Sequence, residues 1–265
     1  MEVLAGKTAV VIGGGGGVGR GISHGLAAEH LNVVVADLDG EAASAVRDEV
    51  GGTAIAAPVD STDETSLEAL RNRCVETFGT VDLLANTVGV ILQRRLDAVA
   101  IAEWNWLWDR AVLSQIRSVN VFLPELRRNP EGHIVLTGAG AALHGTPRGL
   151  DLGPYGVVKH ALAGYARNLR TEVQDEGIGV TLLCPTGIRG DMAANSAASH
   201  GDVVGNAASD VGGQQPPGRR LEDGIILGPV VVEAVRNDSF IASNQLDDLL
   251  AAVDRDRQIL NPRAR

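Results

Sequence analysis

The chain of 265 residues is poor in basic charge, in cysteine and in aromatic side chains. Lys and Arg number 23 against 33 Asp and Glu, a formal net charge of -10, so the composition indicates no basic surface for nucleic acid. The two cysteines, Cys74 and Cys184, stand far apart and form no CxxC pair, which argues against zinc and favours reduced, buried thiols in a cytosolic protein. We therefore expect no metal site and no nucleic-acid partner.

Long hydrophobic runs are also missing. The apolar stretch Ile225–Val232 is too short to span a bilayer and contains Pro229. No secretory leader precedes the first apolar segment, because Val3 and Leu4 run directly into Gly6 and Lys7. These features predict a cytoplasmic protein without a membrane partner.

The chain does contain an alternation of apolar, β-branched runs with helical patterns. The runs are continuous rather than alternating in polarity, as expected of parallel strands buried on both faces. This order predicts an α/β fold, a single-domain Rossmann-type doubly wound parallel sheet with helices on both faces. Expected strands are Thr8–Ile12, Asn32–Ala36, Thr53–Pro58, Leu83–Asn86, His133–Thr137, Val180–Cys184 and Ser239–Ala242; expected helices are Gly19–Glu29, Gly40–Val50, Glu64–Phe78, Ile101–Phe122, Pro154–Asp175 and Gln245–Ile259.

The stretch Ala193–Gly224 is rich in Gly, Ala, Ser and Asn and resembles a linker. Too few residues follow it to build an independent domain. We therefore expect one domain over residues 1–265, with a mobile substrate loop at about 193–224.

A glycine-rich turn follows the first apolar run. Gly13, Gly17 and Gly19 have the spacing G-x-x-x-G-x-G, with Gly15 between them, and a helical pattern begins there. A strand ending in such a turn places bare backbone N–H groups and a helix N-terminus at one point, where a diphosphate binds. Glycine is needed because a Cβ would block the close approach of the phosphates.

Polar residues follow the next strands at the same edge of the sheet. Asp37 ends the second strand, where a carboxylate accepts the hydroxyls of an adenosine ribose and repels a 2′-phosphate. This favours NAD over NADP; the alternative, capping of the next helix, suits Asp39 better. Asp60 and Ser61 follow the third strand, to cap its helix or hold an adenine amino group. Asn86 and Gly89 follow the fourth, where a small turn lets a ribose pack on backbone.

These motifs, with Trp104, the Tyr-x-x-x-Lys pair Tyr155 and Lys159, and the segment Cys184–Gly187, strongly resemble the short-chain dehydrogenase/reductase family from Gly6 to about Met192. The resemblance implies an NAD-dependent oxidoreductase that interconverts a secondary alcohol and a ketone. It implies that Tyr155 and Lys159 are catalytic, with Lys159 also holding the nicotinamide ribose. The further cofactor contacts implied are Val18, Leu38, Pro185, Gly187 and Ile188.

The chemistry of the pair follows from helix geometry. Tyr155 and Lys159 at i and i+4 project from one face of a helix. A phenol with a pKa near 10 is a poor base at neutral pH, and a nearby ammonium lowers that pKa. Tyr155 is then expected to exchange a proton with the reacting oxygen while hydride moves to or from the cofactor.

The sequence departs from the family at two catalytic positions. The family's Ser after the fifth strand aligns with Gly138 and Ala139, and its helical Asn, counted from Trp104, aligns with Ala111. Loss of one such donor typically lowers the rate by about 10²–10³. Four side chains are conceivable substitutes: Thr137, Ser114, Gln115 and His144.

Three functions remain open at this point. The first is an NAD(H)-dependent oxidoreductase on a small hydrophobic substrate: a cyclic, terpenoid, steroid-like or polyketide alcohol. The second is a non-redox enzyme on the same scaffold, a cyclase or isomerase, and the third is a catalytically silent NAD-binding protein. Arg148 and Asp151 are candidate substrate contacts or a solvated ion pair.

The chain is also expected to pair with itself. By resemblance, the helices Ile101–Phe122 and Pro154–Asp175 build a homodimer or homotetramer. Of the tryptophans at 104, 106 and 108, one is expected to pack inward and the others to lie at an interface.

Overall fold

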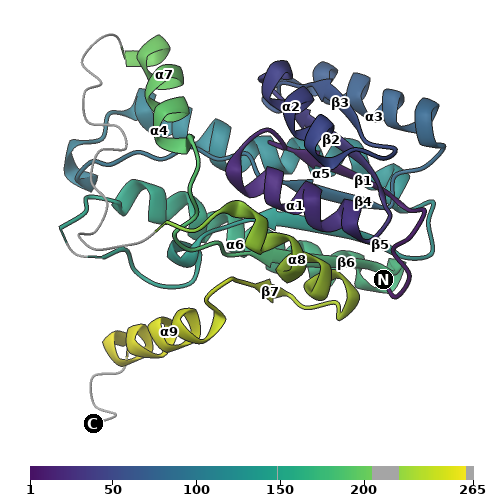
Figure 1. The fold of residues 1–265 in the computed structure, drawn as a ribbon. Helices are drawn as coiled ribbons and strands as arrows, with labels where there is room; N and C mark the ends of the chain where they lie inside the picture. The colour runs from purple at the N-terminus through teal and green to yellow at the C-terminus, as the bar shows by residue number, and fades with distance from the viewer. Residues whose placement is uncertain (148, 205–220, 261–265) are drawn as a thin grey trace.

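The computed structural model describes residues 1–147, 149–204 and 221–260. Seven parallel strands form one sheet in the order β3-β2-β1-β4-β5-β6-β7, a doubly wound arrangement with helices on both faces (Figure 1). The fold class predicted from the sequence is confirmed. The strands are β1 (Thr8–Ile12), β2 (Asn32–Asp37), β3 (Ile55–Pro58), β4 (Leu83–Asn86), β5 (Gly132–Thr137), β6 (Ile178–Leu183) and β7 (Ile241–Ala242).

Helices fill the connections between the strands. They are α1 (Gly17–Ala28), α2 (Gly40–Val50), α3 (Glu64–Phe78), α4 (Ile101–Trp108), α5 (Ser114–Leu126), α6 (Gly153–Val173), α7 (Met192–Val204), α8 (Leu227–Arg236) and α9 (Leu246–Leu260). A π-helical turn, Asp109–Leu113, joins α4 to α5 where the sequence predicted one continuous helix. No helix among the described residues is long and apolar enough to cross a membrane.

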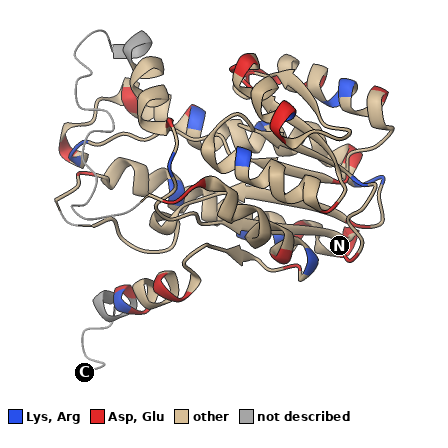
Figure 2. Cartoon of the chain, viewed as in Figure 1, with Lys and Arg blue, Asp and Glu red and all other residues tan. Residues whose placement is uncertain are grey.

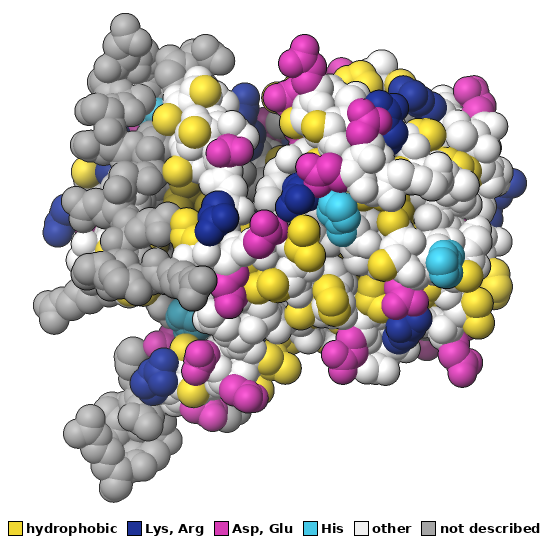
Figure 3. Space-filling view, in the orientation of Figure 1, with side chains coloured by type: hydrophobic (Ala, Val, Ile, Leu, Met, Phe, Trp, Pro, Cys, Tyr) yellow, Lys and Arg dark blue, Asp and Glu magenta, His cyan; other side chains and the backbone are white. Residues whose placement is uncertain are grey.

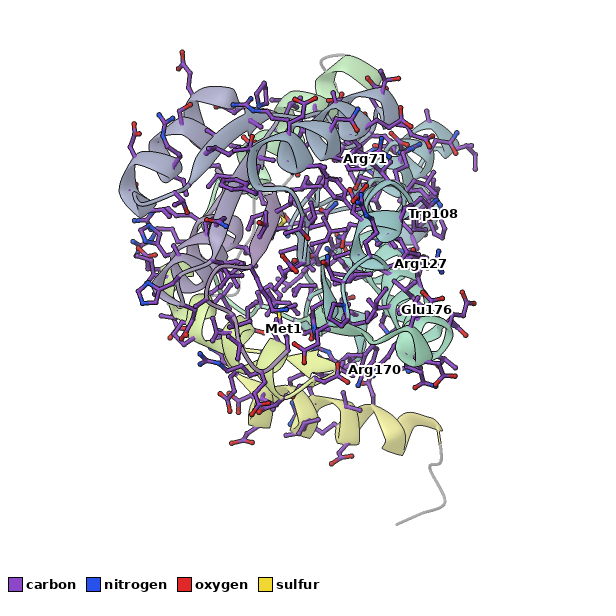
Figure 4. All side chains as sticks on the ribbon, turned by 90° about the vertical axis from the view of Figure 1, so that its right-hand side faces the viewer. Met1, Arg71, Trp108, Arg127, Arg170 and Glu176 are labelled. Atoms are coloured by element: carbon purple, nitrogen blue, oxygen red, sulfur yellow. The ribbon has the colours of Figure 1, made fainter. Side chains whose placement is uncertain are left out.

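Alternate strand residues divide the core into two layers. Val11, Val33 and Val35 face the side covered by α1, α2 and α8, whereas Val10, Ile12 and Val34 face the side of α3, α5 and α6. Both layers are fully buried, because each parallel strand is covered on both faces. On the second side, Arg127 at the end of α5 pairs with Glu176 beyond α6 at 2.6 Å (Figure 4).

The region predicted as a loop is partly helical. Residues 192–204 form α7, which packs against α4, and Gly224–Ile226 form a 3₁₀ turn before α8. Residues 205–220 of that prediction lie outside the described residues. Helix α9 extends away from the sheet, as Figure 1 shows.

Candidate active site

The glycine-rich turn lies between the end of β1 and the start of α1. Gly13 has φ +80°, and a Cβ on it would meet Thr87 Oγ1 at 2.5 Å. A Cβ on Gly19 would overlap the Gly13 carbonyl oxygen. Gly16, the residue before α1, has no side chain to cap the first N–H groups of α1, which include that of Val18. A glycine cradle before an uncapped helix N-terminus fits a diphosphate.

Asp37 fixes this turn from the end of β2. One carboxylate oxygen accepts from the Gly15 N–H at 2.9 Å and the other from the Asp39 N–H at 3.1 Å. Burial raises the pKa of Asp37, and these backbone hydrogen bonds oppose the rise. Asp39 caps α2 as predicted, with its side chain accepting from Glu41 and Ala42. Leu38, between the two aspartates, is exposed.

Asp60 and Ser61 follow β3 but do not cap the next helix. The Asp60 carboxylate accepts from the backbone N–H and the hydroxyl of Thr62, at 2.8 and 2.7 Å, and Ser61 is buried beside it. The cap of α3 is Asp63, so the alternative that Asp60 or Ser61 caps the helix is wrong. Asp60 and Ser61 stay predicted adenine contacts.

Asn86 holds the turn after β4. Its Oδ1 accepts from the Val88 N–H at 2.9 Å, and its Nδ2 donates to Ser118 Oγ at 2.8 Å. The turn places Gly89 against the Lys159 ammonium, because a Cβ on Gly89 would lie 3.3 Å from Nζ. At the same edge of the sheet, Pro185, Gly187 and Ile188 follow β6, and Gly187 has φ +66°.

Tyr155 and Lys159 lie one turn apart on α6. The Lys159 Nζ donates to the Thr137 carbonyl oxygen at 2.8 Å and lies 5.6 Å from the centre of the Tyr155 ring. Lys159 is buried and Tyr155 is half-buried. The expected pair is therefore brought together at the carboxyl edge of the sheet.

The expected lowering of the Tyr155 pKa is not found. Burial, followed by the neighbouring Cys184 thiol, raises the pKa of the phenol, and burial lowers the pKa of Lys159 to about 8. The physical reason is that desolvation disfavours both charged forms, and the ammonium points at the Thr137 carbonyl oxygen. The raised pKa keeps the Tyr155 phenol neutral at pH 7.

The structure locates the two positions at which the sequence departs from the family. Ala139 follows β5 in an extended conformation and carries no hydroxyl, and Ala111 lies fully buried in the π-helical turn. Among the conceivable substitutes, Ser114 bonds the Arg110 carbonyl oxygen and His144 interacts with that of Gly145. The Thr137 hydroxyl is buried and has no hydrogen-bond partner within the part of the chain that the structure describes.

Of the two candidate substrate contacts, Arg148 lies outside the described residues. Asp151 is exposed, and its carbonyl oxygen accepts from the Arg94 N–H at 2.7 Å. Trp106 is buried, whereas Trp108 is 39% exposed on the outer margin of the molecule (Figure 4).

Sequence reasoning missed a polar cluster beside α7. Glu103 of α4 is fully buried, and its Oε1 lies 2.7 Å from Arg94 and 3.2 Å from His200 Nε2 of α7. The sequence carries no short-range signal for it, because the three residues come from separate segments.

The outer surface carries both signs of charge. Figure 2 shows acidic and basic residues on most helices, and on the face in Figure 3 they are interspersed rather than gathered into a basic patch.

Comparison with known proteins identifies the family and supports the fold. The family model described as "short chain dehydrogenase" matches residues 7–201. Among curated proteins, the chain is 28% identical over 201 residues to a fluoren-9-ol dehydrogenase of Terrabacter sp. (strain DBF63), covering 69% of this chain and 56% of that protein. It is 29% identical over 191 residues to the 7alpha-hydroxysteroid dehydrogenase of Escherichia coli (strain K12), covering 71% and 73%.

A solved structure matches nearly the whole chain. It is a short-chain dehydrogenase/reductase from Burkholderia phymatum in complex with NAD, 25% identical, with a TM-score of 0.82 over 99% of this chain and 97% of that one.

Proposed function

Since the chain belongs to the short-chain dehydrogenase family, we propose that it interconverts a secondary alcohol and a ketone with NAD(H), through Tyr155 and Lys159. The observation that carries the proposal is the intact pair at the carboxyl edge, with Lys159 Nζ held by Thr137 2.8 Å away and Tyr155 on the same helix face. A bound nicotinamide would supply or accept the hydride.

The cofactor choice rests on Asp37. Its carboxylate stands beside Gly15 at the end of β2, where it would accept the two ribose hydroxyls and repel a 2′-phosphate. Gly13, Gly17, Val18 and Gly19 would hold the diphosphate. NAD bound to the similar Burkholderia phymatum protein supports a nicotinamide cofactor, and the preference for NAD over NADP is our proposal.

Tyr155 would move the proton. Its raised pKa keeps the phenol neutral, which suits donation of a proton to the oxygen of a ketone undergoing reduction. Removing a proton from an alcohol requires the phenolate, whose fraction rises with pH. We therefore expect alcohol oxidation to be faster at alkaline pH.

The proposed substrate is a small hydrophobic alcohol or ketone. Two similar enzymes are named for a fluorenol and a hydroxysteroid, which supports a cyclic secondary alcohol.

We also propose a cytoplasmic location, since Cys74 and Cys184 are free, buried thiols. We also propose a homodimer or homotetramer; a monomer at micromolar concentration in light scattering would contradict it.

The decisive experiment is a screen of cyclic alcohols with NAD and ketones with NADH, following nicotinamide absorbance. Turnover that falls at least about a hundredfold in Tyr155→Phe, with NADH affinity nearly kept, is the expected result. Product formed without change in NADH would favour the non-redox enzyme, which the Ala139 and Ala111 positions motivate. NAD binding without turnover of any substrate would indicate a silent binding protein.

A further inference from the structure

The side chain of Gln115 makes an unusual set of hydrogen bonds at the centre of the site. It is fully buried on α5. Its Oε1 accepts from the Thr137 N–H at 3.1 Å, and its Nε2 donates to the Thr137 carbonyl oxygen at 3.2 Å and to the Val88 carbonyl oxygen at 3.1 Å. One carboxamide thus binds the end of β5 and the turn after β4 at once.

Lys159 uses the same acceptor. The Thr137 carbonyl oxygen receives both the Gln115 amide and the Lys159 ammonium. The turn that Gln115 holds through Val88 continues into Gly89, which lies against Lys159 Nζ. The oxygen that Nζ binds and the backbone beside Nζ are therefore both fixed by Gln115.

We propose that Gln115 is a positioning residue for Lys159, which it holds in place by clamping the Thr137 carbonyl oxygen to the Val88–Gly89 turn. The inference rests on the proposed role of the Tyr155–Lys159 pair. Gln115 lies one turn beyond Ala111, the position that aligns with the family's helical Asn.

Removing the carboxamide would loosen this end of the sheet. The Thr137 N–H and the Val88 carbonyl oxygen would lose their partners in a buried place, which favours strand movement and entry of water. Burial is the first cause of the lowered Lys159 pKa. Water at the ammonium would relieve that burial, so the Lys159 pKa would rise toward its ordinary value.

The composition makes this rise measurable, because Lys7 and Lys159 are the only two lysines in the sequence. Protein labelled with ¹³C at lysine Cε gives two NMR signals, and Lys7→Arg assigns them. In the unaltered protein Lys159 is expected to titrate at about 8. In Gln115→Met, which keeps side-chain length but cannot form these hydrogen bonds, we expect its midpoint to rise by about one pH unit.

Thr181→Val is the matched control. It also removes a buried polar group, whose hydroxyl bonds His133 and the Ser239 carbonyl oxygen, neither of which touches Lys159 in the described structure. The control is expected to lower thermal stability while leaving the Lys159 midpoint unchanged. If Gln115→Met fails to fold, Gln115→Asn, one methylene too short to reach both neighbours, is titrated in its place with the same expectation.

An unchanged Lys159 midpoint in the folded Gln115 variant overturns the inference, as does an equal shift in Thr181→Val. With a substrate in hand, Gln115→Met should lower kcat by about tenfold or more against the control. If Lys159→Met leaves turnover intact, the proposed function fails instead, and the titration still decides whether Gln115 positions the lysine.

Discussion

At the scale of single residues, Ala139 is the position where we expect a substitution to raise catalytic activity. It follows β5 in an extended conformation, where the family resemblance places a serine. A hydroxyl there would hydrogen-bond the reacting oxygen. We expect Ala139→Ser to raise kcat by about tenfold or more, because one oriented donor to a developing oxyanion is typically worth that much. Steady-state kinetics on the substrate found by the screen measures it, and an unchanged or lower kcat would show that the oxygen is held by another group.

A buried imidazole makes the protein sensitive to acid. Burial lowers the pKa of His133 to about 3, and its Nε2 lies 2.9 Å from Thr181 Oγ1. Between pH 6.5 and 3 the unfolded chain binds the proton that the folded protein excludes, so stability falls as the pH falls through this window. We expect His133→Gln to reduce this loss by about 1.4 kcal/mol per pH unit. Urea unfolding at several pH values measures both slopes, and parallel slopes would refute the assignment.

The sequence predicted part of the site at this scale. The spacing of Tyr155 and Lys159 predicts a shared helix face, and Asp39 has the position of a helix cap; both follow from local geometry. The Lys159 contact with the Thr137 carbonyl oxygen does not, because it joins α6 to β5 across the fold. Gln115 was one of four conceivable substitutes, and only its tertiary partners distinguish it.

At the scale of elements, α1 crosses α8 through glycines. A Cβ on Gly25 would overlap the backbone of Gly228, and a Cβ on Gly21 would overlap that of Gly224. We expect Gly25→Ala to destabilise the protein by about 1–3 kcal/mol, because the two backbones must separate. Gly40 on α2 is the matched control, since a Cβ there would make only an ordinary contact, 3.7 Å from Pro58 Cβ. Gly40→Ala should be neutral or stabilising by up to about 1 kcal/mol, and equal effects in urea unfolding would contradict the close crossing.

Helix α7 forms where the sequence predicted a loop. Its sequence is rich in Ala and Ser and has no strong apolar stripe. Its tertiary partners are distant in sequence: Ser196 Oγ accepts from the Ile91 N–H at 2.9 Å, and His200 packs edge-on against Trp106. Most helical stability in proteins comes from such contacts rather than from propensity. Helix α8 was also not predicted. The strands and helices α1, α2, α3, α6 and α9 were predictable because their apolar runs or stripes are continuous in sequence.

At the scale of the whole molecule, cofactor binding should stabilise the entire fold. The proposed NAD contacts come from β1, β2, β3, β4 and β6, so a bound dinucleotide spans the sheet edge. At about 100 times its Kd, a ligand adds about 2.7 kcal/mol, which raises Tm by about 5 °C or more for a chain of this size. We expect NAD to raise Tm by this amount and NADP to raise it less. In Asp37→Ala, the Tm shifts caused by the two cofactors should be more nearly equal. Equal shifts with both cofactors in the unaltered protein would refute the assigned preference.

Both edge strands of the sheet are short. At one side β3 has only four residues and ends in Pro58, which has no N–H to donate; at the other, β7 has only two residues. Neither border offers a long row of open backbone groups to a neighbouring strand. We therefore expect that copies of this protein do not pair edge to edge into a continuous β-sheet. Association is expected to use side chains of the helices that cover the sheet.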